Sequence, residues 1–157
     1  MSSYLTFYLK PKECKKKLVY DENDCCTEKE VKLSNGEPLH LISYARSSDI
    51  YQAYYKELHP AYVGVNEEYT ELTYEDSKNV CNAFELEIKQ TEKRLEVDYK
   101  MLKESGYAPE LYEEIQSFET YLAEQRSTLQ ELKFISSLVY EISLGYNDFE
   151  KVLINVD

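Results

Sequence analysis

The sequence lacks tryptophan altogether and contains only four glycines in 157 residues. The glycines are isolated from one another: Gly36 belongs to a predicted turn, Gly64 to a connector, and Gly106 and Gly145 to predicted helix ends. Phosphate-binding loops of the Walker and Rossmann kinds need several glycines within a few residues. The sequence therefore argues against nucleotide binding by those motifs, and we predict no cofactor.

Histidine is nearly as rare, because His40 and His59 are the only two. His40 lies in a predicted strand, and His59 precedes a proline at a predicted helix end, where an imidazolium interacts favourably with the helix dipole. Neither Gly-x-Ser-x-Gly nor His-Glu-x-x-His occurs in the sequence. We therefore predict no catalytic residues and a protein that is not an enzyme.

The four cysteines are Cys14, Cys25, Cys26 and Cys81. Structural zinc sites favour cysteine pairs separated by two to four residues, and adjacent cysteines rarely direct both sulfurs at one ion. The spacing therefore predicts free thiols and no metal site.

Long apolar runs are also absent, since none approaches the ~20 residues that cross a bilayer. Residues 1–9 lack the basic segment that opens a secretory signal. We predict no membrane partner and a cytoplasmic location in the cell that expresses the protein, which for a phage protein is its bacterial host.

Acidic residues dominate the charge, with 30 acidic and 18 basic side chains giving a formal net charge of -12. Residues 1–19 carry five lysines against Glu13, residues 20–65 carry eight acidic and four basic residues, and residues 66–157 carry twenty-one and nine. An acidic chain repels a phosphate backbone, so no direct nucleic-acid binding is predicted. The basic run Lys10–Lys17 is interpreted as a solvated loop.

The first third of the chain is typical of strands and turns. Tyr4–Leu9 and Lys17–Tyr20 have strand composition, and the polar run 21–30 follows them. Val31–Leu33 and Leu39–Tyr44 flank the pair Asn35-Gly36, which suits a tight hairpin turn. These segments predict a small antiparallel sheet.

One short helix and one late strand complete the predicted compact part. Ser47 and Ser48 can cap a helix whose apolar residues recur at spacings of three and four, and His59-Pro60 is expected to end it. Lys151–Val156 has strand composition and is expected to return to the sheet.

Two long helices account for nearly half of the chain. Thr73 resembles a capping residue for a helix that runs to Ser105, where Gly106 supplies a stop. Pro109 fits the first turn of a second helix, which runs to Leu144 before Gly145. The short connection predicts an antiparallel hairpin about 50 Å long at 1.5 Å per residue.

Heptad patterns in both helices predict how the hairpin packs. Folding the chain about residues 106–109 sets apolar layers against apolar layers, for example Leu95 against Leu122, and it places Cys81 opposite Ser136. The one clearly polar layer pairs Thr91 with Gln125, and we expect this layer to fix the register because a slipped register would bury the Gln125 amide against leucine.

The sequence thus predicts an α+β fold. A small antiparallel sheet and one short helix, from residues 1–72 and 146–157, form a head, and residues 73–145 form an antiparallel coiled-coil arm. Tyrosine and glutamate concentrate in the later part of the head and at the start of the arm, a combination found at interfaces. The predicted interaction surface comprises Tyr51, Tyr55, Tyr62, Glu67, Glu68, Tyr69, Glu71, Tyr74 and Glu75.

Two functional hypotheses remain open. The first is a non-enzymatic interaction or assembly protein whose head and coiled-coil arm contact a protein partner, such as a basic one; homo-oligomers could form through exposed Val97 and Tyr112. The second is an acidic mimic of nucleic acid that inhibits a basic host protein, as phage-encoded inhibitors of restriction or CRISPR effectors do as a class.

Overall fold

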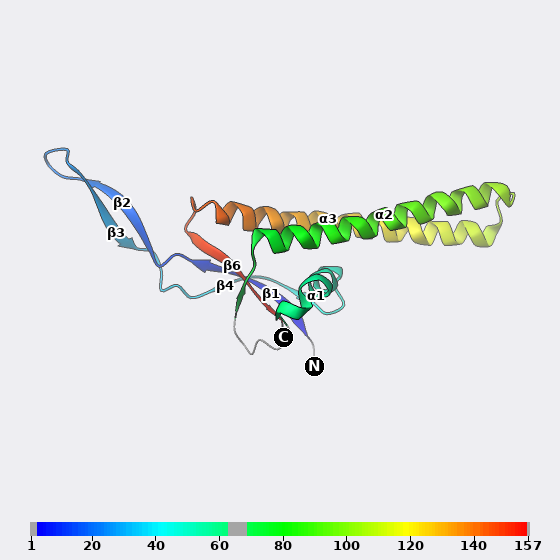
Figure 1. Ribbon diagram of the computed structural model, residues 1–157, viewed down its shortest axis with the longest axis horizontal. Helices are drawn as coiled ribbons and strands as arrows, with labels where there is room; N and C mark the ends of the chain where they lie inside the picture. Colours follow the sequence, from blue (N-terminus) through cyan, green and yellow to red (C-terminus); the bar gives the residue numbers. More distant parts are fainter. Residues whose placement is uncertain (1–2, 63–68, 157) are drawn as a thin grey trace.

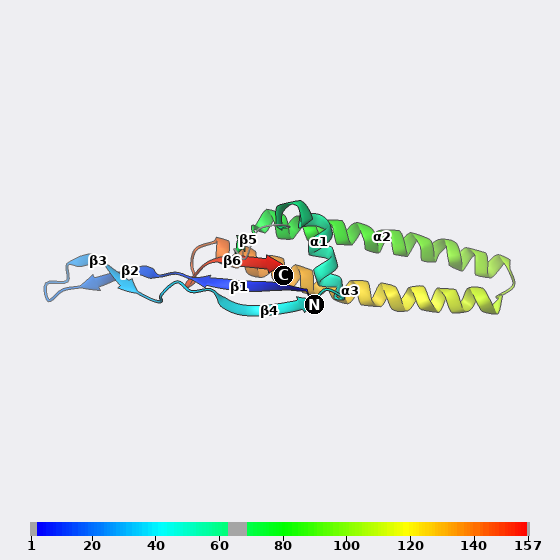
Figure 2. The same ribbon diagram turned by 90° about the horizontal axis from the view of Figure 1, so that it is seen from below.

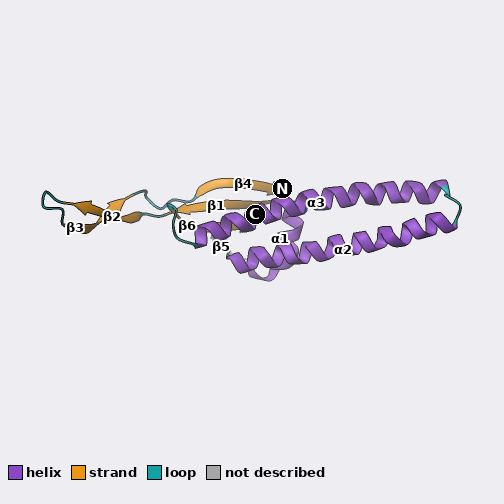
Figure 3. Cartoon of the chain, turned by 90° about the horizontal axis from the view of Figure 1, so that it is seen from above, coloured by secondary structure: helices purple, strands orange, loops and turns teal. Residues whose placement is uncertain are grey.

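The chain forms an elongated molecule, with a strand-rich end and a long helical hairpin (Figure 1). The computed structural model describes residues 3–62 and 69–156, and for residues 59–62 the backbone alone. A pair of strands projects at one end and the tip of the helical hairpin at the other, with the main sheet and a short helix between them (Figures 1 and 3). The predicted α+β class is confirmed.

The main sheet has four antiparallel strands in the order β4-β1-β6-β5. They are β1 (Tyr4–Pro11), β4 (Leu39–Ala45), β5 (Thr70–Glu71) and β6 (Phe149–Val156). The expected return of the last strand is confirmed, because β6 pairs along the whole of β1, from Leu5 opposite Val156 to Pro11 opposite Phe149.

The predicted hairpin at Asn35-Gly36 is wrong. The strand before it, β3 (Cys26–Lys32), pairs with β2 (Cys14–Tyr20), and the strand after it pairs with β1. The backbone next to the turn is already bonded elsewhere, since the Leu33 N–H donates to the Glu13 carbonyl oxygen at 2.7 Å. Gly36 still adopts a left-handed backbone conformation, with a φ of +77°, which glycine takes at little steric cost.

The real hairpin turn lies in the acidic segment between β2 and β3. One Asp21 carboxylate oxygen accepts hydrogen bonds from the N–H groups of Asn23 at 2.8 Å and Cys25 at 2.9 Å. An aspartate that bonds its own following backbone in this way stabilises a turn. The polar run 21–30 and the lysine run therefore contribute to two strands, and the interpretation of the lysines as a loop is corrected.

All fourteen residues of β2 and β3 are exposed, and the two strands form a separate sheet (Figure 1). We call this pair the β-ribbon. Alternation along the strands sets Lys15, Lys17, Val19, Lys29 and Val31 on one face, since directly paired residues share a face.

Helix α1 (Asp49–Tyr62) crosses the helical hairpin part-way along its length and contacts both of its helices (Figure 2). Its start is as expected, because the Ser48 hydroxyl oxygen accepts from the Ile50 N–H at 3.2 Å. The helix passes the expected end at His59-Pro60 by two residues. A proline inside a helix removes one backbone hydrogen bond and crowds the preceding turn, which weakens the helix but does not always end it.

The hairpin itself matches the prediction closely. Helix α2 spans Tyr74–Glu104 and α3 spans Pro109–Ser143. Thr73 caps α2, its hydroxyl accepting from the Asp76 N–H at 3.1 Å, and Gly106 and Gly145 take φ angles of +71° and +80° just beyond the helix ends. Local sequence therefore determines where each helix begins and ends.

Ion pairs between α2 and α3 show which residues of the two helices lie opposite each other. Glu92 pairs with Arg126 at 3.6 Å and Glu85 with Lys133 at 3.3 Å. At the base of the hairpin, Ser136 bonds to Ser77 at 3.3 Å, one turn from the expected partner Cys81.

The sheet covers the base of α3, where Ile135, Val139 and Ile142 are buried (Figure 2). The cover is incomplete, because Phe134 remains 68% exposed. One hydrophobic core joins the sheet and α1 to the hairpin, along which it extends as far as Leu102 and Ile115. Its most completely buried side chains are Leu5, Phe7, Tyr54, Leu72, Val80, Ile115, Leu132, Val152 and Ile154.

Candidate functional site

Tyr51 does not belong to the predicted interaction surface. It is only 5% exposed, and with Ile50, Tyr54 and Leu58 it forms the buried stripe of α1. Tyr55, one turn later, is exposed enough to contact a partner and stacks on Tyr51 at a centroid distance of 5.9 Å. Tyr62 ends α1, and its side chain lies outside the described residues, as do Glu67 and Glu68 entirely.

The other predicted surface residues lie around the start of α2. The ring of Tyr69 packs against that of Tyr8 with a distance of 4.8 Å between the ring centroids. The rings of Tyr74 and Tyr140 are 5.1 Å apart by the same measure. Both tyrosines are exposed, as are the carboxylates of Glu71 and Glu75. Their role as an interaction surface stays a prediction.

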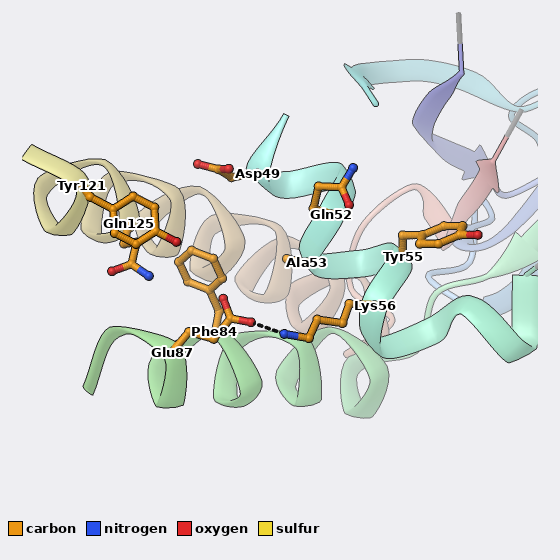
Figure 4. A pocket seen from close by; sticks show the side chains of 9 residues that line it. All are labelled: Asp49, Gln52, Ala53, Tyr55, Lys56, Phe84, Glu87, Tyr121 and Gln125. Atoms are coloured by element: carbon orange, nitrogen blue, oxygen red, sulfur yellow. Dashed lines mark hydrogen bonds and ion pairs between the residues drawn. The ribbon is translucent and has the colours of Figure 1, made fainter. Parts of the chain in front are cut away.

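A cavity of about 600 Å³ opens between α1, α2 and α3 (Figure 4). We call it the helix cavity. Such a volume is within the range of ligand sites in proteins. It is lined by Asp49, Gln52, Ala53, Tyr55, Lys56, Phe84, Glu87, Tyr121 and Gln125.

The polar layer of the hairpin lies at this cavity. Gln125 is 3% exposed and Thr91 is buried, and both line a second hollow of about 480 Å³ that shares residues with the first. The two side chains are not joined: the Thr91 hydroxyl donates to the Glu87 carbonyl at 3.2 Å, and the buried Gln125 Oε1 has no hydrogen-bond partner among the residues that the structure describes. That this layer fixes the register stays a prediction.

Lys56 and Glu87 form the rim of the helix cavity (Figure 4). The Lys56 ammonium donates to the Glu87 carboxylate at 2.6 Å, joining α1 to α2. This hydrogen bond and the charge of Glu87 raise the pKa of Lys56, which is therefore cationic at neutral pH. The lysine neutralises one of the carboxylates at the cavity.

Arg94 lines the second hollow. The Arg94 guanidinium lies 5.4 Å from the centre of the Phe118 ring, and it contacts the carboxylates of Asp98 and Glu114 at 3.4 Å each. A guanidinium between an aromatic face and carboxylates is a favourable cation–π and ionic arrangement.

Asp98 was missed by the sequence analysis. It is 3% exposed and occupies the heptad position between Leu95 and Leu102, where an apolar residue is expected. Extending the heptad pattern one step beyond Leu95 would have identified it as a buried charge.

An apolar groove of about 600 Å³ runs between β4 and the base of α3. Strand β4 lies at the edge of the sheet and carries no Lys, Arg, Asp or Glu, although charged residues make up 31% of the chain. Edge strands of soluble proteins usually carry charges that prevent further pairing. Leu41, Ile42 and Phe134 line the groove and are exposed.

A bulge in β4 brings His40 and Ser43 together. Tyr8 pairs with His40 while Phe7 pairs with Ile42, so Leu41 is the extra residue. The Ser43 hydroxyl is 2.9 Å from the His40 Nε2 and 2.9 Å from the Thr6 hydroxyl. Both His40 and Ser43 are exposed and neither lines the cavities described above, so this contact is best explained as support for the bulge.

The cysteines are free, with Cys14, Cys25 and Cys26 exposed on or beside the β-ribbon and Cys81 buried in α2. Burial, and then the Glu85 carboxylate, raise the pKa of the Cys81 thiol, which keeps it protonated. In the part of the chain that the structure describes, no three His, Cys, Asp or Glu side chains are placed to hold a metal ion.

Comparisons with protein-family models, with curated proteins and with solved structures give no match. Within residues 3–62 and 69–156, no helix has the length and apolar character needed to cross a bilayer. The chemistry of the helix cavity and the exposure of the β-ribbon are therefore the observations on which a function can be argued.

Proposed function

We propose that this chain is a non-enzymatic interaction or assembly protein that acts in the cytoplasm of the cell expressing it. The observation that carries the proposal is the β-ribbon, in which all fourteen strand residues are exposed. An isolated two-stranded ribbon is marginally stable in water. A partner that covers one face of the ribbon would stabilise it.

The helical hairpin supports the same proposal from the opposite end of the molecule (Figure 1). Its outer half extends beyond the sheet and α1, and it exposes Val97, Tyr99 and Tyr112. Aromatic side chains with a polar tip are enriched at protein interfaces. The open edge of β4 and its apolar groove add a third surface.

The test uses two shortened proteins. One replaces the β-ribbon with a short turn, and the other removes one heptad from each helix, symmetrically about Gly106, so that the remaining layers keep their pairing. Circular dichroism checks that both fold, and affinity capture followed by reconstitution with the purified partner compares them with the whole chain. We expect specific partners to be lost with one of the two segments; full retention by both would exclude the β-ribbon and the tip of the hairpin as binding surfaces.

A second candidate is the acidic mimic of nucleic acid, as used by phage-encoded inhibitors of basic host proteins. It is favoured by α3, which carries seven glutamates against Arg126 and Lys133 over 35 residues. Competition with DNA for a basic effector, measured across salt concentration, tests it, since phosphate contacts are strongly salt-dependent. Unchanged DNA occupancy at every salt concentration would remove this candidate.

A further inference from the structure

Strand β4 lies at an edge of the main sheet and is seven residues long. Within residues 3–62 and 69–156 it pairs with β1 on one side and with no strand on the other (Figure 3). The other edge strands are charged or short: β2 contains three lysines, β3 contains four charged residues, and β5 consists of Thr70 and Glu71. Charge and shortness both hinder pairing with further strands. Strand β4 has neither, so its edge can accept another strand.

An apolar surface continues from this edge onto α3. Ile42 is paired with the buried Phe7 and therefore shares its face of the sheet, and it lines the apolar groove between β4 and α3 together with Leu41. On the α3 side of the groove, Phe134 is 68% exposed. Exposed apolar surface beside a free backbone edge is typical of an interaction site. The occupant has to provide both a strand and apolar side chains.

The absence of charge on β4 indicates which strand pairs there. A strand that docks a basic partner would be expected to carry acidic residues, which are abundant in this chain, but β4 carries none. A strand that pairs with its own copy has to avoid charge, because a twofold axis places residues near its centre opposite themselves or their neighbours, where like charges repel. Two chains of net charge -12 also repel each other, so we expect them to meet at an uncharged part of their surface.

We infer that two copies of this chain pair through β4, in antiparallel orientation about a twofold axis perpendicular to the sheet. The two four-stranded sheets then form one continuous sheet. Such an axis keeps helix α3 of both copies on the same side of that sheet, so the two grooves join and Phe134 lines the shared space from both sides. The inference goes beyond the proposed function, because it leaves the β-ribbon and the tip of the hairpin, at the two ends of the molecule, for other proteins (Figure 1).

The first test uses the unmodified chain. Analytical ultracentrifugation should give twice the chain mass of 18.5 kDa at about 100 µM protein. In hydrogen exchange, the amides of residues 39–45 should exchange more slowly at high than at low protein concentration, because the second strand bonds to their free edge, while the amides of β2 and β3 should not change. A monomer at every concentration, or concentration-dependent protection that leaves out β4, would overturn the inference.

Variants at Ile42, in the middle of β4, test the twofold axis. Ile42→Lys and Ile42→Glu each place like charges at the contact, and each should weaken dimerisation about tenfold or more. Mixing the two variants should restore dimerisation, because unlike charges then meet, and this rescue requires β4 to contact β4. Val97→Lys, on the exposed face of α2, is the control and should remain dimeric.

Circular dichroism checks that each variant folds, and if the Ile42 variants do not fold, the hydrogen exchange of the unmodified chain decides. Folded Ile42 variants that still dimerise alone, a mixture that stays monomeric, or loss of the dimer in Val97→Lys would each contradict pairing through β4. Because no other protein takes part, these results are separate from the capture experiment that tests the proposed function.

Discussion

Arg94 and Asp98 lie one turn apart on α2, and the Arg94 Nε–H donates to the buried Asp98 carboxylate at 3.4 Å. The second carboxylate oxygen, Oδ2, is buried and has no hydrogen-bond partner within residues 3–62 and 69–156. A buried charge that loses its partner is strongly destabilising, and solvent screening at the exposed arginine reduces the effect. Arg94→Gln should therefore lower the free energy of unfolding by about 1 to 2 kcal/mol, measured by urea denaturation.

Replacing both residues separates the pair from its parts. Arg94→Gln combined with Asp98→Asn should recover part of the loss, because no unpaired charge remains buried. Lys93 is exposed on the same helix, and Lys93→Gln should change stability by less than about 0.5 kcal/mol. A loss in Lys93→Gln as large as in Arg94→Gln would show that net charge, and not the contact, is responsible.

Thr73→Ala should destabilise the protein by about 1 kcal/mol, because the hydroxyl that accepts from the Asp76 N–H at the start of α2 is lost. Thr120→Ala is the control, since the Thr120 hydroxyl donates to Gln116 O within α3 and caps no helix end. Thermal denaturation should show a lower midpoint for the first variant only. Equal midpoints would mean that Thr73 contributes nothing as a cap.

Gln125→Leu should raise the free energy of unfolding by about 1 kcal/mol, because it replaces a buried unpaired carbonyl with an apolar group of similar size. Gln116→Leu on the exposed face gives the baseline. A loss of stability in Gln125→Leu would indicate that the amide has a partner in solution.

Lys17 and Lys29 are directly opposite each other in the β-ribbon. Like charges in such a pair repel, so Lys29→Glu should stabilise the ribbon by about 0.5 kcal/mol. Hydrogen exchange of the ribbon amides should slow accordingly. Lys32→Glu is the control because Lys32 faces the uncharged Cys14, and equal slowing in both variants would exclude the pairwise explanation.

A thiol reagent should modify Cys14, Cys25 and Cys26 in the native protein and leave Cys81 unmodified. Cys81 is buried, so the reagent cannot reach it, and burial also raises the pKa of its thiol. Counting modified thiols by mass spectrometry before and after unfolding tests this. Four modified thiols in the native state would show that the base of the hairpin opens readily.

The helices could be predicted closely because their limits depend on adjacent residues. Thr73, Gly106, Pro109 and Gly145 act through their own backbone or its next turn. The strand pairing could not be predicted in the same way. The segment after Asn35-Gly36 pairs with β1, which is far away in sequence, and not with β3. The residues of the turn do not indicate which of these two strands is the partner.

The candidate site could be predicted only in part from the sequence, for a similar reason. The polar layer of Thr91 and Gln125 follows from heptads alone, but the cavity beside it requires α1. Lys56 reaches Glu87 across thirty-one positions of the chain, a contact that no local pattern indicates. The placement of Tyr51 was also decided by packing, since tyrosine suits both a core and a surface.

The position of β6 within the sheet has a consequence for how the chain folds. Strand β6 lies between β1 and β5, yet it follows both long helices in the sequence. During synthesis the hairpin of α2 and α3, whose contacts are local, can form while β1 still has one side without a neighbour. The sheet and the core beneath it are completed only when residues 149–156 leave the ribosome, so the early strands need protection from other chains until then.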